Sequence, residues 1–351
     1  MIQIPVPASR NYDVLVECGL LNISGNKLQR VCKQGCRIAI ISDSNVWPLY
    51  GSGVQISLEQ VGFSVLHFVF PAGEASKTAE TYLQILNFLA ENHITRSDSL
   101  LALGGGVVGD MTGFVAATYL RGISYIQVPT SLLAMVDSSV GGKTAIDLPA
   151  GKNLVGAFYQ PSLVLCDPSV LSTLPQTIFS DGCAEVIKYG MLYDPQLFAQ
   201  LRKEGMNFDR ESVISRCIAL KRDVVCADEF DTGLRQKLNF GHTIGHGVEA
   251  QSNFEISHGH AVAIGMATIT KAAVSRGYCS ADVLTELLIM LKAFALPSST
   301  QYLAGELLNS MLSDKKRSGN HVNLIVPRSI GDCQILPTPV DELESFIQEG
   351  L

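Results

Sequence analysis

Four of the chain's seven histidines fall within one short segment, and this clustering is the strongest chemical signal in the sequence. Residues 239–265 read NFGHTIGHGVEAQSNFEISHGHAVAIG and contain His242, His246, His258 and His260. On a helix, His242 and His246 share one face, where two imidazoles can bind one divalent metal. His258 and His260 are two residues apart and diverge on a regular helix, so only one of them is expected to reach a metal shared with His242.

A catalytic zinc site needs three protein ligands and an open position, and the histidines supply two of the three. Glu185, in the otherwise apolar helical pattern DGCAEVIKYG, is a candidate for the third ligand. Thr243 stands where a zinc protease would carry its catalytic glutamate, so protease chemistry is excluded. A lone histidine is more often structural or exposed, but four together favour a metal site.

A glycine-rich loop follows a predicted strand at 99–103 and opens a predicted helix. The segment LALGGGVVGD places Gly104, Gly106 and Gly109 in the spacing GxGxxG. Such a loop lets the backbone approach a pyrophosphate at a helix N-terminus. The acidic residue usually found about 20 positions later is missing, since that region reads ISYIQVPTSLL. The loop therefore indicates either a dinucleotide site in a variant fold or a tight strand-to-helix turn.

Two lysines also follow glycines, in the segments SSVGGKTAID and AGKNLVG. Lys143 and Lys152 beside flexible backbone suit the binding of oxyanions, although solvated surface lysines are the alternative interpretation. The first segment is not a nucleotide-binding P-loop, because Asp137 occupies the position where GxxxxGKT requires glycine.

The elements that must position these residues change in character near Pro168. Short apolar runs predict strands, and the spacing of apolar residues predicts a helix over 76–93. The predicted strands are 37–42, 64–70, 99–103, 123–129 and 162–167. Beyond Pro168 helical periodicity dominates, apart from a predicted strand at 321–327. We expect an α/β domain with a mostly parallel sheet over 1–168 and a mainly α-helical domain over 169–351.

The composition favours a folded globular protein and argues against several other classes. The 351 residues are 47% apolar and 17% charged, as in a folded globular protein, and the net charge of −7 argues against nucleic-acid binding. Nine cysteines without a CxxC pair predict reduced thiols in the cytoplasm. The N-terminus shows no secretory signal, and no apolar stretch reaches about 20 residues, so no membrane association is expected.

Taken in order, eight segments resemble the 3-dehydroquinate synthase family of sugar-phosphate cyclases over residues 71 to about 327. They are PAGEASKT, LALGGGVVGDMTGFVAATYLRG, VPTSLLAMVDSSVGGKTAID, GKNLVGAFYQP, AEVIKYG, GLRQKLNFGHTIGH, HGHAVAIGM and DKKRSG. The combination of Arg235, Asn239, His246 and the pair Lys315–Lys316 resembles the dehydroquinate branch in particular. This resemblance implies that residues 1–168 form a Rossmann-like, NAD-binding α/β domain and that residues 169–351 form a mainly α-helical domain that binds metal and substrate. It also implies an active homodimer.

The resemblance also implies a lyase activity in the shikimate pathway of aromatic amino acid biosynthesis. The substrate would be 3-deoxy-D-arabino-heptulosonate 7-phosphate, and the products 3-dehydroquinate and phosphate. NAD would oxidise a ring hydroxyl transiently; phosphate elimination, reduction and an intramolecular aldol closure would follow. Alternatives are another sugar-phosphate cyclase, an NAD- and metal-dependent polyol or glycerol-phosphate dehydrogenase, and a non-catalytic metal-buffering protein.

By the same resemblance, Glu185, His242 and His258 match ligands of zinc or cobalt. The catalytic residues would be His246, Lys188, Lys143 and Asn239. Substrate contacts would come from Asp137, Lys143, Lys152, Asn153, Lys188, Lys221, Arg235, Asn239, Lys315 or Lys316, and Arg121 of a partner subunit. NAD contacts would come from Asp43, Asn45, Glu74, Lys77, Gly105, Gly106, Val107, Asp110, Thr130, Ser131, Lys143, Lys152 and Thr173.

The chain departs from the family pattern at two positions. The family usually has glutamate where this chain has His260 and where it has Asp231. The first departure concerns the surroundings of the metal, and the second a predicted salt-bridge position. Neither removes one of the proposed metal ligands.

Overall fold

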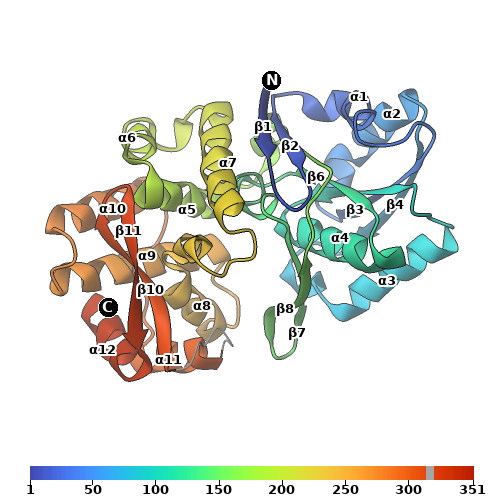
Figure 1. Cartoon of the computed structure of the whole chain (residues 1–351). Coiled ribbons are helices and arrows are strands. Elements are labelled where there is room, and N and C mark those ends of the chain that lie inside the picture. Colours follow the sequence, from blue (N-terminus) through green and yellow to red (C-terminus); the bar gives the residue numbers. More distant parts are fainter. Residues whose placement is uncertain (314–319) are drawn as a thin grey trace. The chain divides into compact units, whose positions relative to one another are not determined.

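The computed structural model describes residues 1–313 and 320–351, which form two compact units (Figure 1). The first unit comprises residues 1–174 and 210–230, and the second comprises residues 175–209 and 231–351. The boundary at residue 168, between an NAD-binding and a metal-binding domain, remains a proposal. None of the described helices is both long enough and apolar enough to cross a membrane.

The first unit is built on a seven-stranded sheet in the order β1-β2-β9-β6-β5-β3-β4. All neighbouring strands are parallel except the antiparallel pair β1–β2 at one edge. The strands are β1 (Ile2–Val6), β2 (Tyr12–Val16), β3 (Arg37–Asp43), β4 (Ser64–Phe70), β5 (Ser99–Gly104), β6 (Ser124–Pro129) and β9 (Leu163–Cys166). Each strand expected from the sequence in this region is present, and the predicted α/β architecture is confirmed.

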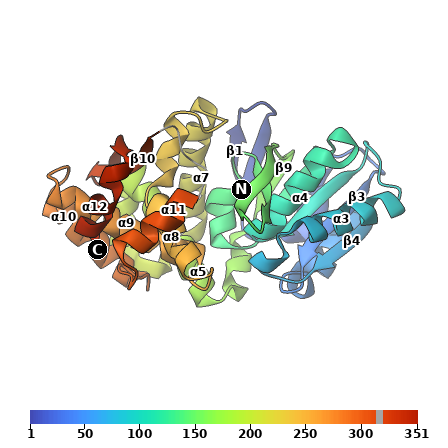
Figure 2. The same cartoon turned by 90° about the horizontal axis from the view of Figure 1, so that it is seen from below.

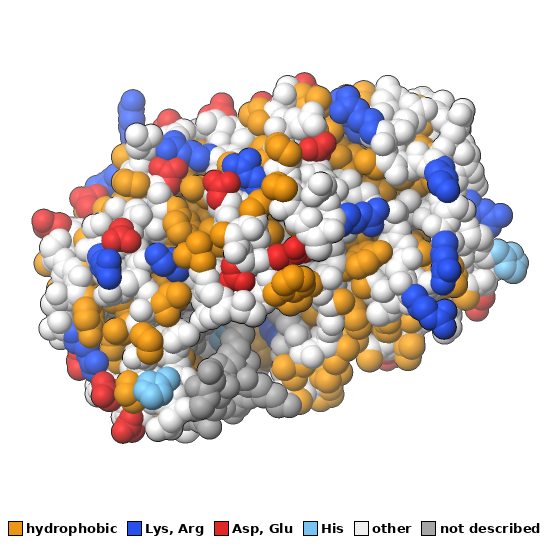
Figure 3. Space-filling model, in the orientation of Figure 1, with side chains coloured by type: hydrophobic (Ala, Val, Ile, Leu, Met, Phe, Trp, Pro, Cys, Tyr) orange, Lys and Arg blue, Asp and Glu red, His pale blue; other side chains and the backbone are white. Residues whose placement is uncertain are grey.

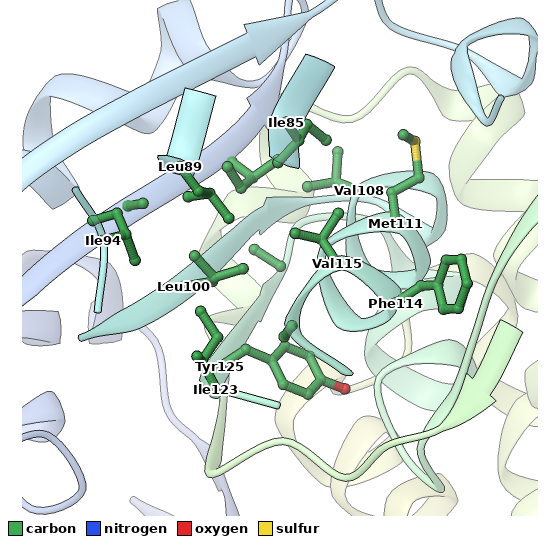
Figure 4. Close-up of a cluster of buried hydrophobic side chains, with 14 of the residues drawn as sticks. Ile85, Leu89, Ile94, Leu100, Val108, Met111, Phe114, Val115, Ile123 and Tyr125 are labelled. Atoms are coloured by element: carbon green, nitrogen blue, oxygen red, sulfur yellow. The ribbon is translucent and has the colours of Figure 1, made fainter. Parts of the chain in front are cut away.

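Helices α3 (Ala79–Glu91) and α4 (Gly106–Thr118) bury their apolar faces with the sheet. In α3, the side chain of Thr78 accepts a hydrogen bond from the Thr81 N–H and caps the helix. Figure 4 shows Leu89 of α3 close to Leu100 of β5, and Met111 of α4 within the same cluster. This packing fixes the start of α4, and therefore the glycine loop, against the end of β5. Helices α1 (Ser24–Leu28) and α2 (Ser52–Gln60) complete this part of the unit.

Two further elements of the first unit carry predicted site residues. The antiparallel hairpin of β7 (Lys143–Leu148) and β8 (Gly151–Phe158) is a separate two-stranded sheet. Helix α7 (Arg210–Ala227) packs on β1, β2 and the helical turn η5 (Ala134–Ser138), which explains why it belongs to the first unit despite its late position in the chain.

The second unit is mainly helical, as the sequence predicted. The strand predicted at 321–327 is present, and it pairs with a second strand, β11 (Asp332–Pro339), that was not predicted, to form an antiparallel hairpin. Its elements are α5 (Gln176–Tyr193), α6 (Pro195–Glu204), η8 (Leu234–Asn239), α8 (His242–Gln251), α9 (His258–Ser275), α10 (Ala281–Ala293), α11 (Ala304–Ser313), β10 (His321–Ser329), β11 (Asp332–Pro339) and α12 (Val340–Gly350). Helix α9 packs against α5, α8, α10 and α12 and is buried almost throughout. In Figure 2, α8, α9, α11 and α12 lie next to one another.

Two glycines of α9 allow its neighbours to approach closely. A Cβ added to Gly265 would lie 1.9 Å from the carbonyl oxygen of Gly241, just before α8. A Cβ added to Gly259 would lie 1.9 Å from the carbonyl oxygen of Asp181 in α5. Any larger residue at either position would push the helices apart. These contacts bring α5, α8 and α9 together, the three helices that carry the candidate metal ligands.

Candidate active site

Glu185 of α5, His242 of α8 and His258 of α9 meet inside the second unit. One potential ligand atom from each of the three side chains lies within 4.8 Å of the other two. Oε1 of Glu185 is 3.5 Å from Nε2 of His242 and 3.6 Å from Nε2 of His258. The structure therefore brings together the three residues that the sequence proposed as metal ligands. Their role as ligands remains a proposal.

Local backbone geometry places both histidines at the start of a helix. His242 is the first residue of α8 and follows Gly241, which adopts a left-handed conformation with φ of 78°. A side chain at Gly241 would be strained there, and its Cβ would lie 2.7 Å from the carbonyl oxygen of Val262. Nδ1 of His242 is 3.1 Å from the carbonyl oxygen of Phe240, so a proton held on Nδ1 leaves Nε2 to face Glu185.

The donor set fits a divalent metal such as zinc or cobalt. The Glu185 side chain is fully buried, and one of its carboxylate oxygens forms an ion pair with the ammonium group of Lys188. The other oxygen, Oε1, faces Nε2 of His242 and Nε2 of His258. A buried carboxylate needs compensating positive charge, which Lys188 and a bound metal would supply together. One oxygen and two nitrogen donors make the three-ligand set of a catalytic metal centre, which keeps a further position open.

This environment shifts the pKa values of His242 and His258 in opposite directions. Burial holds the pKa of His242 well below its usual range, and the nearby cation of Lys188 lowers it further. Burial would also lower the pKa of His258, but the carboxylates of Glu185 and Glu249 raise it to about 10. The cluster thus attracts positive charge at His258, where a metal ion and a proton compete. Metal binding is therefore expected to weaken as the pH falls.

Sequence reasoning missed Glu249, a buried carboxylate of α8. His246, Glu249 and His258 form a second group whose ligand atoms lie within 4.8 Å of one another. Glu249 follows His246 by three residues and His242 by seven, so all three lie on one side of α8. A charged residue in a largely apolar helix was the signal that singled out Glu185, and it would have found Glu249 as well.

His260 lies outside both groups and contacts α5 instead. Its Nδ1 is 2.9 Å from Oδ1 of Asp181, and its backbone N–H donates to the same oxygen at 2.9 Å. The hydroxyl of Ser257 also donates to Asp181. Ser257 occupies the N-cap position of α9 without capping it, so Asp181 takes over that role from a neighbouring helix.

Asp181 is therefore expected to stabilise the start of α9 only while it is ionised. Burial would raise its pKa, but hydrogen bonds from His260, Ser257 and backbone N–H groups hold the pKa below the ordinary 3.8. A depressed carboxylate pKa adds stability above pH 3.8 that is lost as the pH falls through the folded value. Asp181→Asn should destabilise α9 by about 1 kcal/mol at neutral pH and remove this acid-dependent part. Hydrogen exchange of the first α9 amides, measured against pH without metal, checks this. Equal exchange rates in Asp181→Asn and in the parent protein, over the pH range in which Asp181 titrates, would contradict the capping role.

In the first unit, five predicted cofactor or substrate residues form two groups. Nζ of Lys77 is 2.7 Å from Oδ2 of Asp110 and 2.6 Å from Oδ1 of Asn153, and Lys77 is almost completely buried. This first group links α4 with the β7–β8 hairpin. In the second group, Nζ of Lys152 lies 3.7 Å from Oε1 of Glu74.

A second group joins α7 to η5. Nζ of Lys221 donates to the carbonyl oxygen of Asp137 at 2.6 Å and forms an ion pair with the carboxylate of that residue. The ion pair is possible because α7 packs in the first unit. Sequence spacing alone gave no reason to place residue 221 beside residue 137.

The remaining predicted NAD contacts lie at loops following the strands or at helix starts. Gly105, Gly106 and Val107 form the beginning of α4. Oδ1 of Asp43 accepts hydrogen bonds from the backbone N–H groups of Asn45 and Val46. The N–H of Thr130 donates to the carbonyl oxygen of Gly104, Ser131 Oγ accepts from the N–H of Ala134, and Thr173 is hydrogen-bonded to Tyr50.

The remaining predicted substrate contacts lie in both units. Lys143 is exposed at the start of β7, and Arg121 has a left-handed backbone with φ of 67°. In the second unit, Lys188 and Arg235 are almost completely buried, and Asn239 is the last residue of η8. Lys315 and Lys316 lie outside the described residues.

Asp231, the second departure from the family pattern, adopts an uncommon backbone conformation. This residue has a left-handed backbone with φ of 59°. Aspartate tolerates that conformation better than longer side chains because it can hydrogen-bond to nearby backbone.

The fold matches solved structures of sugar-phosphate cyclases. A 2-deoxy-scyllo-inosose synthase complexed with carbaglucose-6-phosphate, NAD+ and Co2+ superimposes with a TM-score of 0.89 at 24% identity, covering 100% of both chains. A 2-epi-5-epi-valiolone synthase from Streptomyces hygroscopicus subsp. jinggangensis 5008, with NAD+ and Zn2+ bound, gives a TM-score of 0.88 at 27% identity over 96% of this chain and 95% of the other. The fold is therefore that of the sugar-phosphate cyclases.

Sequence comparisons identify the branch within this class. The family models described as 3-dehydroquinate synthase N-terminal and C-terminal match residues 67–181 and 182–317. A 3-dehydroquinate synthase from Streptococcus suis (strain 05ZYH33) is 44% identical over 344 residues, which are 96% of this chain and 97% of the relative. The chain belongs to the 3-dehydroquinate synthase family, and the resemblance noted in the sequence is confirmed.

Proposed function

We propose that this chain converts 3-deoxy-D-arabino-heptulosonate 7-phosphate to 3-dehydroquinate and phosphate, as its family membership indicates. The observation that carries the proposal is the buried cluster of Glu185, His242 and His258, whose donor atoms suit a catalytic divalent metal. NAD and zinc or cobalt are its proposed cofactors, because related cyclases of the same fold contain them.

Different residues of the chain bind the metal, bind NAD+ and transfer protons in the proposed reaction. Glu185, His242 and His258 hold the metal, and the glycine loop holds NAD+. When bound, the metal supplies Lewis acidity toward substrate hydroxyls, and NAD+ accepts a hydride and later returns it. His246 moves protons at the substrate, since imidazole has the right pKa range for acid–base work near neutral pH.

The substrate carries a phosphate and a carboxylate, so binding it requires several cations in an otherwise acidic protein. Lysine and arginine donors bind such groups through charge-assisted hydrogen bonds. The proposed donors are Lys143, Lys152, Lys188, Lys221, Arg235, and Lys315 or Lys316, with Asn153 and Asn239 adding neutral hydrogen bonds. Asp137 orients Lys221, with which it is paired.

The glycine loop gives a test of NAD binding that separates affinity from folding. A Cβ at Gly105 would lie 3.6 Å from Oγ of Ser131, an ordinary contact, and the φ of −75° suits alanine. Gly105→Ala should therefore fold normally but lose about tenfold or more in NAD affinity, because the methyl group blocks the approach of the pyrophosphate. Gly104→Ala is the control for misfolding, since its Cβ would lie 2.4 Å from Cγ2 of Val108. Equilibrium titration with NAD+ measures the affinity of each variant, and thermal unfolding measures its stability. Unchanged affinity in Gly105→Ala would contradict the assignment.

A homodimer is the proposed assembly, and the exposed apolar side chains of strand β8 support it. Leu154, Val155 and Phe158 are more than one third exposed, and Phe158 stacks edge-on with the exposed Phe230 at 5.3 Å. Figure 3 shows hydrophobic side chains on the surface where Figure 1 places the β7–β8 hairpin. An exposed apolar strand in a two-stranded sheet tends to be covered by a partner.

Val155→Glu should then shift the protein toward monomers in sedimentation velocity, because it places a charge on the proposed contact. Thr285→Glu, a charge added at an exposed site on α10, is the matched control. A sedimentation coefficient that is the same in both variants and the parent would argue against this interface. If Arg121 serves the partner's site, Val155→Glu should also lower the lyase activity.

A cytoplasmic location is proposed from the cysteines. All nine are free thiols, which suits a reducing compartment.

A substrate panel tests the proposed function against its alternatives. The purified chain is incubated with NAD+ and Co2+ or Zn2+, and separately with the heptulosonate phosphate, glucose 6-phosphate, glycerol phosphate and glycerol. The proposal predicts release of phosphate and formation of 3-dehydroquinate from the first compound alone. NADH formation with glycerol or glycerol phosphate would instead identify a dehydrogenase, and metal binding without turnover of any compound a non-catalytic protein.

A further inference from the structure

We propose that Glu249 is a positioning residue that fixes the tautomer of His258 and directs its Nε2 toward Glu185 and the metal. No role is assigned to Glu249 by the proposed mechanism. The inference rests on the proposed function only in taking Glu185, His242 and His258 as metal ligands. It concerns how the protein prepares one of those ligands.

The two ring nitrogens of His258 face two different carboxylates. Nε2 lies 3.6 Å from Oε1 of Glu185, and Nδ1 lies 3.5 Å from Oε2 of Glu249. Neutral imidazole carries a single N–H, so the acceptor beside Nδ1 keeps the proton on that nitrogen. The lone pair of Nε2 is then available on the side of Glu185, as metal ligation requires.

Burial of Glu249 supports a dedicated role. Its side chain is only 3% exposed, and a carboxylate is rarely buried without a charged or hydrogen-bonding partner. It lies on α8, the helix that packs most extensively on α9, where His258 is the first residue. The contact therefore joins the two helices at the point where the ligand must be held still.

His242 shows the same arrangement with a weaker partner. Its Nδ1 faces the carbonyl oxygen of Phe240 at 3.1 Å, and its Nε2 faces Oε1 of Glu185 at 3.5 Å. Both proposed ligands are thus oriented through Nδ1, one by a neutral carbonyl and one by a carboxylate. The carboxylate increases the basicity of its imidazole more strongly, so loss of Glu249 should be felt in the strength of the metal bond.

A competing interpretation makes Glu249 a ligand itself, together with His246 and His258. His258 faces Glu249 with Nδ1, so this arrangement would turn His258 away from Glu185 as a metal ligand. It would also leave out Glu185 and His242, although Oε1 of Glu185 lies within 3.6 Å of Nε2 of both His242 and His258. The positioning role accounts for the neighbours of both ring nitrogens of His258, and we favour it for this reason.

The test compares Glu249→Gln and Glu249→Ala with Glu185→Gln in the full chain. Glu255→Ala is the matched control, since Glu255 is exposed and lies three residues before His258. Zinc affinity is measured by competition with a chelator, and the visible absorption spectrum is recorded with Co2+ in place of zinc. Thermal unfolding without metal verifies that each variant is folded. The near-isosteric glutamine keeps the test valid if the alanine variant does not fold.

We expect Glu249→Ala to lower zinc affinity by about 10- to 100-fold, the usual effect of removing a partner of a ligating histidine. Glu249→Gln should lose less, because its amide oxygen still accepts from Nδ1, and its cobalt spectrum should keep its intensity with shifted bands. Glu185→Gln should lose the most, and Glu255→Ala should match the parent.

Two results would overturn the inference. One is zinc affinity and a cobalt spectrum unchanged in Glu249→Ala and Glu249→Gln. The other is loss of metal in Glu249→Gln equal to or greater than that in Glu185→Gln, which would make Glu249 a ligand. Both readouts are independent of turnover, so failure of the proposed lyase function would be recognised separately by the absence of product.

Discussion

Replacing His242 or His258 with alanine is expected to remove bound metal and lyase activity together. Each change deletes one of the three donors around the proposed metal, and the buried carboxylate of Glu185 cannot replace a lost imidazole. Zinc affinity should fall by more than the 10- to 100-fold that follows from disturbing a ligand's partner. Metal analysis of the purified variants, alongside assays of phosphate release, checks both effects.

Two other histidines provide the controls for this prediction. His246→Ala should keep the metal but lose rate, because His246 is assigned to proton transfer. His260→Gln should keep both, since Nδ1 of His260 contacts Asp181 of α5 rather than the metal cluster. Full metal content in His258→Ala, or loss of metal in His260→Gln, would mean that the wrong histidine has been assigned.

Removing single cations from the substrate site is expected to lower kcat/KM strongly. Lys143→Ala and Arg235→Ala should each cost about 1.5–3 kcal/mol, or roughly 10- to 150-fold, for one lost charge-assisted hydrogen bond. NAD affinity should change little in Arg235→Ala, because Arg235 lies in the second unit and the glycine loop in the first. Steady-state kinetics and an NAD+ titration measure the two quantities separately.

The exposed Lys33→Ala is a suitable control, because it removes one positive charge from the first unit without touching a proposed site residue. A loss of kcat/KM in Lys33→Ala as large as in Lys143→Ala would indicate a general effect of net charge. Unchanged kinetics in Arg235→Ala would refute its assignment to the substrate.

Local patterns predicted the central sheet because its strands carry short apolar runs, as in β3 and β5, which are buried along most of their length. We did not predict β1, β2, β11 or the β7–β8 hairpin. Strands β1 and β8 are largely exposed and lack such apolar runs. Local periodicity could not predict that α7 belongs to the first unit. It depends on packing against β1, β2 and η5, which are distant in sequence.

The candidate metal site could likewise be predicted from the sequence only in part. Histidine spacing and one carboxylate in an apolar helix indicated a metal site and made Glu185 a candidate, but they left open whether His258 or His260 completes it. The resemblance to the family implied the set Glu185, His242 and His258, which the structure brings together. Spacing could not show that the two nitrogens of His258 face different carboxylates, because Glu249 and Glu185 come from separate helices. It also could not show that His260 contacts Asp181 of α5.

In the proposed reaction NAD acts as a catalyst that the chain regenerates in each turnover. To test this, the metal-loaded protein is incubated with excess heptulosonate phosphate and substoichiometric NAD+, and phosphate, 3-dehydroquinate and NADH absorbance are followed together. We expect many phosphates released per NAD+, an equal amount of 3-dehydroquinate, and no net NADH. Phosphate release that stops after one equivalent per NAD+, with NADH accumulating to the same amount, would contradict it.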